Sequence, residues 1–230
     1  MEAVVEFCGE RYPLDEGMVF TVGRDADLTV DENPFLHRKF LQIHKDRGLW
    51  WITNVGSRLV ATLSDGDGLF QAWIGPSAQL PLVFSTLSVW FTAGPTTYEI
   101  SISNSLAPFV YGYSQEITAG ATTVGKVNLT PEQTLLLLAM AEPMLRRGQN
   151  GSANLPSSSE IAKRLNWSLP KFNRKLDSIC QKLEKIGVPG LHGGSEKLAS
   201  NRRARLVEYA VASRLVKYED LSLLDGLGSC

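Results

Sequence analysis

The stretch FLQIHKDRGLWWIT at residues 40–53 decides the fold of the first half of the chain. Two short segments rich in β-branched and aromatic residues, 40–44 and 49–53, flank the turn sequence Asp46-Arg47-Gly48. Segments of this composition favour extended strands, and glycine suits a tight turn between them. The stretch therefore predicts two consecutive β-strands.

Similar short segments lie on both sides of this stretch, up to about residue 103. Turn sequences that contain Gly, Pro or Asp separate them, and no helical pattern interrupts the series. The segments are 4–7, 18–22, 59–63, 69–74, 80–84, 88–92 and 98–102. Many short strands at such regular spacing predict an all-β sandwich.

The hydrophobic pattern changes to a helical period after residue 129. The sequences 130–133 (TPEQ) and 157–160 (SSSE) each place a Gln or Glu three positions after a hydroxyl residue, a pattern typical of a helix N-terminus. A third helix is expected after Ser168 and a fourth after Asn201. The third has a single apolar stripe, formed by Phe172, Leu176, Ile179, Leu183 and Ile186.

We therefore expect two domains, an all-β sandwich at residues 1–103 and an all-α helix-turn-helix unit at 129–230. The segment 104–128 between them is rich in Gly, Ser and Thr and predicts a linker. Residues 149–156 are expected to form a polar loop. The length of 230 residues agrees with two domains.

Composition excludes several classes of protein. The three cysteines, Cys8, Cys180 and Cys230, are too scattered for a disulfide framework or a zinc site. No apolar run reaches the ~20 residues that span a bilayer, and the N-terminus is acidic where a signal peptide is basic. No phosphate-binding glycine motif and no metal-ligand spacing of the three histidines is present. These observations predict a cytoplasmic protein that is not an enzyme, has no cofactor or metal, and does not bind a membrane.

The net charge of −1 conceals two halves of opposite charge. Residues 1–104 carry a net charge of −6, whereas residues 157–217 contain 13 Lys and Arg against 5 Asp and Glu, a net charge of +8. A basic region of this kind is a candidate for binding a polyanion.

The first half resembles the forkhead-associated (FHA) family. The resemblance rests on the ordered motifs Gly23-Arg24, His37-Arg38-Lys39-Phe40 and Asn54-Val55-Gly56-Ser57. It implies an eleven-stranded β-sandwich whose loops bind phosphothreonine peptides. Arg24 and Arg38 match the family's phosphate-binding positions, and Arg58 and a protonatable His37 are expected beside them.

The same motifs depart from the family pattern at three places. His37 replaces the family's phosphate-binding serine, Phe40 replaces its loop-bracing histidine, and Leu59-Val60 replaces the Asn-Gly pair whose asparagine holds the peptide backbone. Two partners therefore stay open, a phosphothreonine segment or an unmodified protein.

The second half resembles the DNA-binding domain of LuxR-type regulators, which is related in shape to sigma-factor region four. Ser159-Glu160-Ile161-Ala162-Lys163-Arg164-Leu165 matches the Glu-Ile-Ala-x-x-Leu helix, and residues 168–183 match the recognition helix. The helix at residues 201–216 resembles one that often mediates homodimerisation. Longer loops at 147–157 and 184–200 depart from the family.

This resemblance implies double-stranded DNA as a partner. The N-terminal side chains of a recognition helix lie nearest the base edges in the major groove. The candidates for groove contacts are Lys171, Asn173, Arg174 and Lys175. Those for phosphate contacts, which position the protein without specifying sequence, are Lys163, Arg164, Arg202 and Arg203.

Two functions follow from the sequence. The first is a transcriptional or signalling regulator in which a degenerate FHA-type domain is joined to a DNA-binding helix-turn-helix domain. The alternative is a protein-interaction adaptor in which neither half binds DNA. Both hypotheses assign the chain a role in binding rather than in catalysis.

Overall fold

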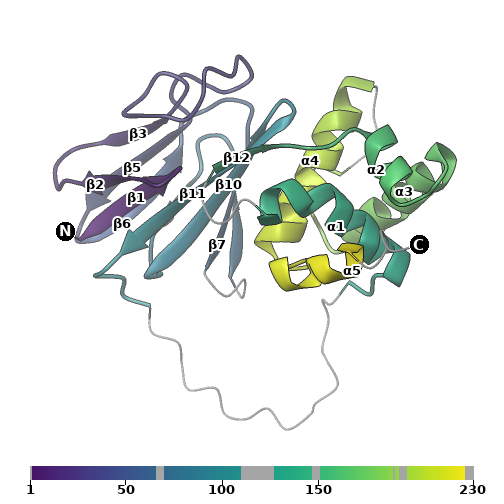
Figure 1. The fold of residues 1–230 in the computed structure, drawn as a ribbon. Coiled ribbons are helices and arrows are strands. Elements are labelled where there is room, and N and C mark those ends of the chain that lie inside the picture. The colour runs from purple at the N-terminus through teal and green to yellow at the C-terminus, as the bar shows by residue number, and fades with distance from the viewer. Residues whose placement is uncertain are drawn as a thin grey trace, which may run out of the picture.

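The computed structural model describes residues 2–65, 70–109, 127–146, 151–188, 190–191 and 196–225. For residues 151–153 and 196–201 it describes the backbone only. Strands form the first half of the chain and helices most of the second, and the two halves lie side by side (Figure 1). Residues 110–126, most of the predicted linker, lie outside the described residues.

The described part of the first half contains eleven strands in two sheets, as the FHA resemblance implies. One sheet has the order β2-β1-β11-β10-β7-β8 and the other the order β4-β3-β5-β6-β9. The first consists of β1 (Ala3–Phe7), β2 (Glu10–Leu14), β7 (Ala61–Asp65), β8 (Gln71–Ile74), β10 (Thr86–Ala93) and β11 (Thr96–Asn104). The second consists of β3 (Phe20–Gly23), β4 (Leu28–Thr29), β5 (Leu41–Asp46), β6 (Leu49–Asn54) and β9 (Gln79–Pro81).

The strands β5 and β6 confirm the prediction from residues 40–53. They pair antiparallel from Leu41 opposite Asn54 to Asp46 opposite Leu49. Residues of β6 alternate between buried and half-buried, so one face of the strand packs into the sandwich core. Gly48 in the connecting turn has φ of 78°, a conformation that glycine adopts without strain.

The polar segment at residues 149–156 contains a strand that the sequence did not predict. β12 (Gly151–Asn154) pairs antiparallel with β11, from Thr96 opposite Asn154 to Glu99 opposite Gly151. Beyond the part of β11 that pairs with β1, the backbone groups of this edge need partners, and β12 supplies them. The strand therefore arises from a distant pairing rather than from its own composition.

The described helices of the second half are α1 (Pro131–Arg146), α2 (Ser158–Arg164), α3 (Leu169–Lys185), α4 (Glu196–Ala212) and α5 (Ser222–Asp225), with a 3-10 turn η1 (Tyr218–Leu221). Ser157 caps α2 in a complete capping box with Glu160, and Ser168 caps α3, as predicted. The apolar stripe of α3 is buried apart from Ile186. The fourth helix begins at Glu196, before the expected cap Asn201, and η1 and α5 were not predicted.

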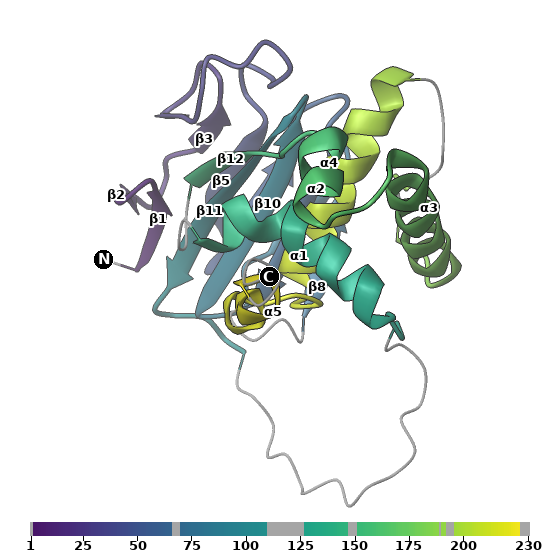
Figure 2. The same cartoon turned by 45° about the vertical axis from the view of Figure 1, so that its right-hand side comes forward.

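The two halves share an interface between α4 and the sheet that contains β10 (Figure 2). Trp90 of β10 belongs to the apolar core of the helical half. Glu208 of α4 is fully buried, and its carboxylate accepts hydrogen bonds from Thr62 (2.6 Å) and Thr92 (2.9 Å) of the sheet. It also forms an ion pair with Arg205 at 2.5 Å.

This interface occupies one face of the helix that the sequence suggested for a homodimer. The buried residues of α4 pack inside the chain, against the sandwich and the other helices. That face cannot contact a second copy while α4 lies on the sheet, and a homodimer through the other face stays a prediction. Interfaces between the halves involve residues far apart in the sequence, so the hydrophobic period within one helix does not predict them.

Candidate functional site

Three loops of the sandwich lie together and carry the residues that the sequence singled out. The backbone N–H of Arg24, after β3, donates to the carbonyl of His37 (2.9 Å), and that of Asp25 donates to the carbonyl of Arg38 (3.0 Å). The backbone N–H of Ser57, after β6, donates to His37 Nε2 at 3.0 Å. These hydrogen bonds hold the three loops in one arrangement.

Gly23 permits the close approach of two of these loops. A Cβ atom at this position would lie 2.1 Å from the carbonyl oxygen of Arg38. Because real side chains cannot occupy this space, only glycine allows residues 37–38 to cross directly over the end of β3. The glycine before Arg24 is thus a requirement of the loop packing.

His37 supports the loop after β6. Its ring stacks on Phe40, with a centroid distance of 5.9 Å and an interplanar angle of 15°. A Cβ atom on Gly56 would lie 2.9 Å from the Phe40 ring, so a glycine is needed beside this pair. The pair occupies the positions where the family has its phosphate-binding serine and its bracing histidine. The two residues that depart from the family pattern therefore contact each other.

Burial and the nearby positive charge of Arg58 lower the pKa of His37 below its usual value of 6.5. In the structure Nε2 of His37 accepts the hydrogen bond of the Ser57 N–H, which requires this nitrogen to be unprotonated. His37 therefore positions the loop after β6, and its contact with a phosphate stays a prediction.

The three arginines of the site have no acidic partner among the residues that the structure describes. Arg38 and Arg58 are exposed and Arg24 is half-buried. Within the part of the chain that the structure describes, none of their guanidinium groups forms an ion pair. Arginine presents a planar set of donors that suits phosphate and carboxylate groups. The site can therefore bind an anion without first breaking an internal ion pair.

The loop after β3 owes its shape to a carboxylate. Asp27 accepts hydrogen bonds from the backbone N–H of Thr21 (2.8 Å) and from its hydroxyl group (2.6 Å). These bonds lower the pKa of Asp27, so the carboxylate is ionised at neutral pH. Its charge is engaged with Thr21 and not with Arg24.

Two asparagines missing from the predicted site, the half-buried Asn33 and the buried Asn54, anchor the other loops. Asn33 donates to the carbonyl of Ala93 (2.9 Å) and to the hydroxyl of Tyr98 (2.8 Å), which in turn donates to Asp31 (2.7 Å). Burial and Asp31 raise the pKa of Tyr98 to about 12. Asn54 donates to the carbonyl of Leu59 in the same loop and to that of Ile74 at the end of β8, and it accepts from the N–H of Gly56. Only the position of Asn54, directly before Val55-Gly56, carries a sequence signal for this role.

Most of the predicted DNA-contacting residues have partners inside the chain. Lys171 forms an ion pair with Glu132 (2.7 Å), and its ammonium lies 4.4 Å from the Trp167 ring centroid. Lys175 also pairs with Glu132. The two lysines lower the pKa of Glu132 to about 2. These contacts connect the N-terminus of α1 to α3.

Three of the four candidates for DNA-phosphate contacts also have partners inside the chain. Arg202 pairs with Asp177 at 2.8 Å, and Arg203 donates to the hydroxyl of Ser158 at 2.7 Å. Arg164 binds the carboxylate of Glu142 through both of its terminal nitrogens. The set without a partner among the described residues is Lys163, Asn173 and Arg174, all of which are exposed.

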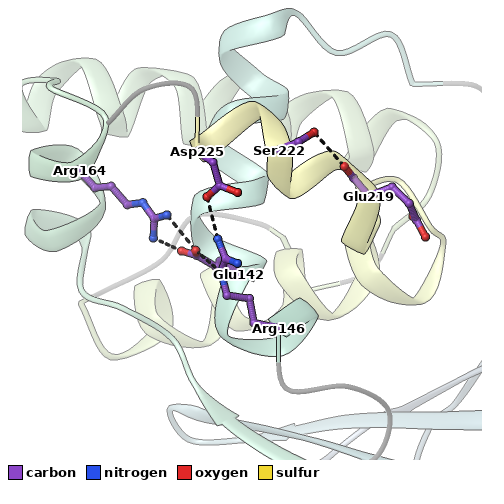
Figure 3. Close-up of polar contacts among 6 residues, drawn as sticks. All are labelled: Glu142, Arg146, Arg164, Glu219, Ser222 and Asp225. Carbon is purple, nitrogen blue, oxygen red and sulfur yellow. Dashed lines mark hydrogen bonds and ion pairs between the residues drawn. The ribbon is translucent and has the colours of Figure 1, made fainter. Parts of the chain in front are cut away.

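Glu142 is the centre of a polar network that explains the position of Arg164 (Figure 3). The carboxylate is largely buried and accepts from Arg164 of α2 and, at 2.6 Å, from Arg146 Nε of α1. Arg146 also donates to Asp225 of α5 at 2.9 Å. Three helices thus meet around one carboxylate, so Arg164 stabilises their packing.

Comparisons with solved structures found FHA domains. FHA-1 of Rv1747 of Mycobacterium tuberculosis is 18% identical, with a TM-score of 0.33, and the match covers 45% of this chain and 95% of that chain. The FhaA FHA domain, crystallised with the intracellular domain of Rv3910, is 19% identical, with a TM-score of 0.31 and coverages of 44% and 98%. The FHA domain of an Arabidopsis thaliana hypothetical protein is 19% identical, with a TM-score of 0.35 and coverages of 47% and 90%. Likenesses of this size carry no argument about ligands, so we base the function on this chain's own residues.

No protein-family model matches the chain, and no curated protein matches it significantly. Among the described residues, no group of His, Cys, Asp or Glu side chains is placed to hold a metal ion. None of the described helices is long and apolar enough to cross a membrane. The absence of a metal, a cofactor and catalytic activity stays a prediction.

Proposed function

We propose that this chain is a signalling module of the cytoplasm whose sandwich binds a phosphothreonine segment of a partner protein. The observation that supports the proposal is a set of three arginines, without acidic partners in the described part of the chain, on loops held together by hydrogen bonds. Arg24, Arg38 and Arg58 would contact the phosphate, and Ser57 offers a hydroxyl group beside them. The activity would be binding alone, without catalysis.

The affinity is expected to be modest. Leu59 packs against the sandwich core at the position where the family has a peptide-clamping asparagine. An apolar side chain supplies neither donor nor acceptor to a peptide backbone. Binding energy should therefore depend mainly on the phosphate, which makes the complex sensitive to salt.

Fluorescence polarisation with a degenerate phosphothreonine peptide library and its unphosphorylated counterpart tests the proposal. Hydrogen bonds to charged groups contribute ~1.5–3 kcal/mol, so Arg24→Ala should weaken binding about tenfold or more. Arg47→Ala is the matched control, because Arg47 is an exposed arginine in the β5–β6 turn, at the other end of these strands. Equal binding of both libraries, or an unchanged affinity of Arg24→Ala, would contradict the proposal.

A second candidate function is DNA binding by the helical half, favoured by the exposure of Lys163, Asn173 and Arg174. Titration of mixed duplex DNA at low salt tests it, because counterion release makes such binding fall steeply with salt. Arg174→Ala should weaken binding more than Lys171→Ala, since Lys171 already pairs with Glu132. If the wild-type chain binds no duplex DNA, the adaptor hypothesis replaces the regulator hypothesis.

A further inference from the structure

A pocket lies on the sandwich, beside the segment that joins β2 to β3. It has a volume of about 200 Å³, and its apolar walls include Leu14, Met18, Val19, Phe20 and Trp50. None of the candidate phosphate-binding arginines lines it. Clefts for drug-sized ligands measure ~300–1,000 Å³, so this pocket suits a single aliphatic side chain.

The rim of the pocket is apolar and exposed to solvent. Met18 is 65% exposed and Val19 is 53% exposed. They follow a turn in which the N–H of Met18 approaches the carbonyl of Asp15 at 3.4 Å and Gly17 has φ of 83°. Adjacent exposed apolar side chains around a concavity are typical of an interaction site rather than of an ordinary surface.

Trp50 forms part of the pocket wall. Its side chain is almost completely buried, at 2% exposure, so it belongs to the sandwich core as well as to the pocket. The Trp50 ring is therefore a fixed reporter at the base of the pocket rather than a flexible rim residue.

The surroundings of the pocket are acidic. Asp15 and Asp27 line it, whereas Glu16 in the adjoining turn is paired with Lys45, which lies beside the Trp50 ring. Hydrogen bonds from Thr21 and Lys45 lower the pKa values of Asp27 and Glu16, so both are ionised at neutral pH. Residues 1–104 as a whole carry a net charge of −6. The local and the overall charge both favour a cationic partner.

We propose that this pocket binds a segment of a partner protein that presents one aliphatic side chain between arginine or lysine residues. The aliphatic side chain enters between Met18, Val19 and Phe20 and packs toward Trp50. The basic side chains face Asp15 and Asp27. The pocket shares Asp27 with the loop after β3 but contains none of the candidate phosphate-binding arginines.

Two-dimensional 1H–15N NMR of the full chain tests this proposal through the indole N–H signal of Trp50, assigned with Trp50→Phe. The probes are the capped tripeptides acetyl-Arg-Leu-Arg-amide, acetyl-Arg-Ser-Arg-amide and acetyl-Glu-Leu-Glu-amide. We expect the first to move the Trp50 signal in a saturable way at millimolar concentration. The serine and glutamate peptides should bind at least fivefold more weakly, because each lacks one of the two recognised features.

Two surface variants separate docking from folding. Val19→Ser and Asp15→Lys alter exposed side chains, so the remaining spectrum should stay unchanged while the affinity for the first peptide falls at least threefold. Glu219→Lys, an exposed acidic residue of the helical half, is the matched control and should bind as the wild type does. An unmoved Trp50 signal, or equal affinity for all three peptides, would overturn the proposal. Arg24→Ala should leave this titration unchanged, so failure here is distinguishable from failure of phosphothreonine binding.

Discussion

Removal of the Glu208 carboxylate should affect the packing of the two halves against each other more than any other single change. The residue is fully buried, and it is the acceptor for Thr62 Oγ1, Thr92 Oγ1 and Arg205. Glu208→Ala leaves two buried hydroxyl groups and a largely buried guanidinium without their acceptor. The loss of one partner from a buried ion pair costs ~3–5 kcal/mol, and we expect a destabilisation in this range.

Urea unfolding followed by circular dichroism measures this effect. With a dependence on urea of ~2 kcal/mol per molar, a loss of about 4 kcal/mol lowers the midpoint by about 2 M. Glu208→Gln keeps one acceptor oxygen and should fall between the wild type and Glu208→Ala. Glu219→Ala, an exposed glutamate, should change the stability by no more than ~0.5 kcal/mol.

A triple variant distinguishes lost hydrogen bonds from lost packing. Thr62→Val, Thr92→Val and Glu208→Leu together replace the polar contacts by apolar ones, which often restores stability when a buried charge is removed. The triple variant should therefore be more stable than Glu208→Ala. If Glu208→Ala loses less than ~1 kcal/mol, the carboxylate does not hold the halves together.

Three further predictions concern single positions. Gly23→Ala should destabilise the sandwich by ~1–3 kcal/mol in thermal unfolding, since its Cβ would collide with a carbonyl oxygen; Gly75→Ala, where a Cβ meets nothing within 4 Å, should not. The lowered pKa of His37 makes its contribution to stability complete above pH 6.5 and lost as the pH falls through the folded value. His37→Phe should therefore abolish this part of the pH profile, and an unchanged profile would show that another group titrates. The pKa of Glu132 is lowered from 4.5 to about 2, so its contribution to folding stability is complete above pH 4.5 and is lost toward pH 2. The difference in stability between the wild type and Glu132→Gln should therefore vanish near pH 2. A difference that persists there would contradict the ion pairs.

Local sequence patterns determined most of the secondary structure. The alternating residues of β6 and the apolar stripe of α3 each define one buried face, because strand and helix periods place those residues together without reference to the rest of the chain. Ser157 and Ser168 begin their helices by satisfying backbone N–H groups within three residues. Such interactions depend on neighbours along the chain, so they can be read from it.

The candidate phosphate site was predictable in part. Ordered motifs identified Arg24, Arg38 and Arg58 by resemblance, and the structure adds that their loops are tied by backbone hydrogen bonds. The hydrogen bond from the Ser57 N–H to His37 and the burial that lowers the pKa of His37 were not predictable, since both depend on how the loops pack together. The ion-pair partners of Lys171 and Arg164 were not predictable either. A lysine or arginine on a helix is expected to be exposed unless the helix that packs against it is known.

Only the tertiary structure decided which surfaces remain available to partners. β12 forms because an edge of β11 needs hydrogen-bond partners, and α4 is covered because Glu208 and Trp90 join it to the sheet. These interactions connect residues that lie tens to more than a hundred positions apart in the sequence. Pairing across such separations depends on which groups the completed fold leaves unsatisfied, and no local period or motif carries that information.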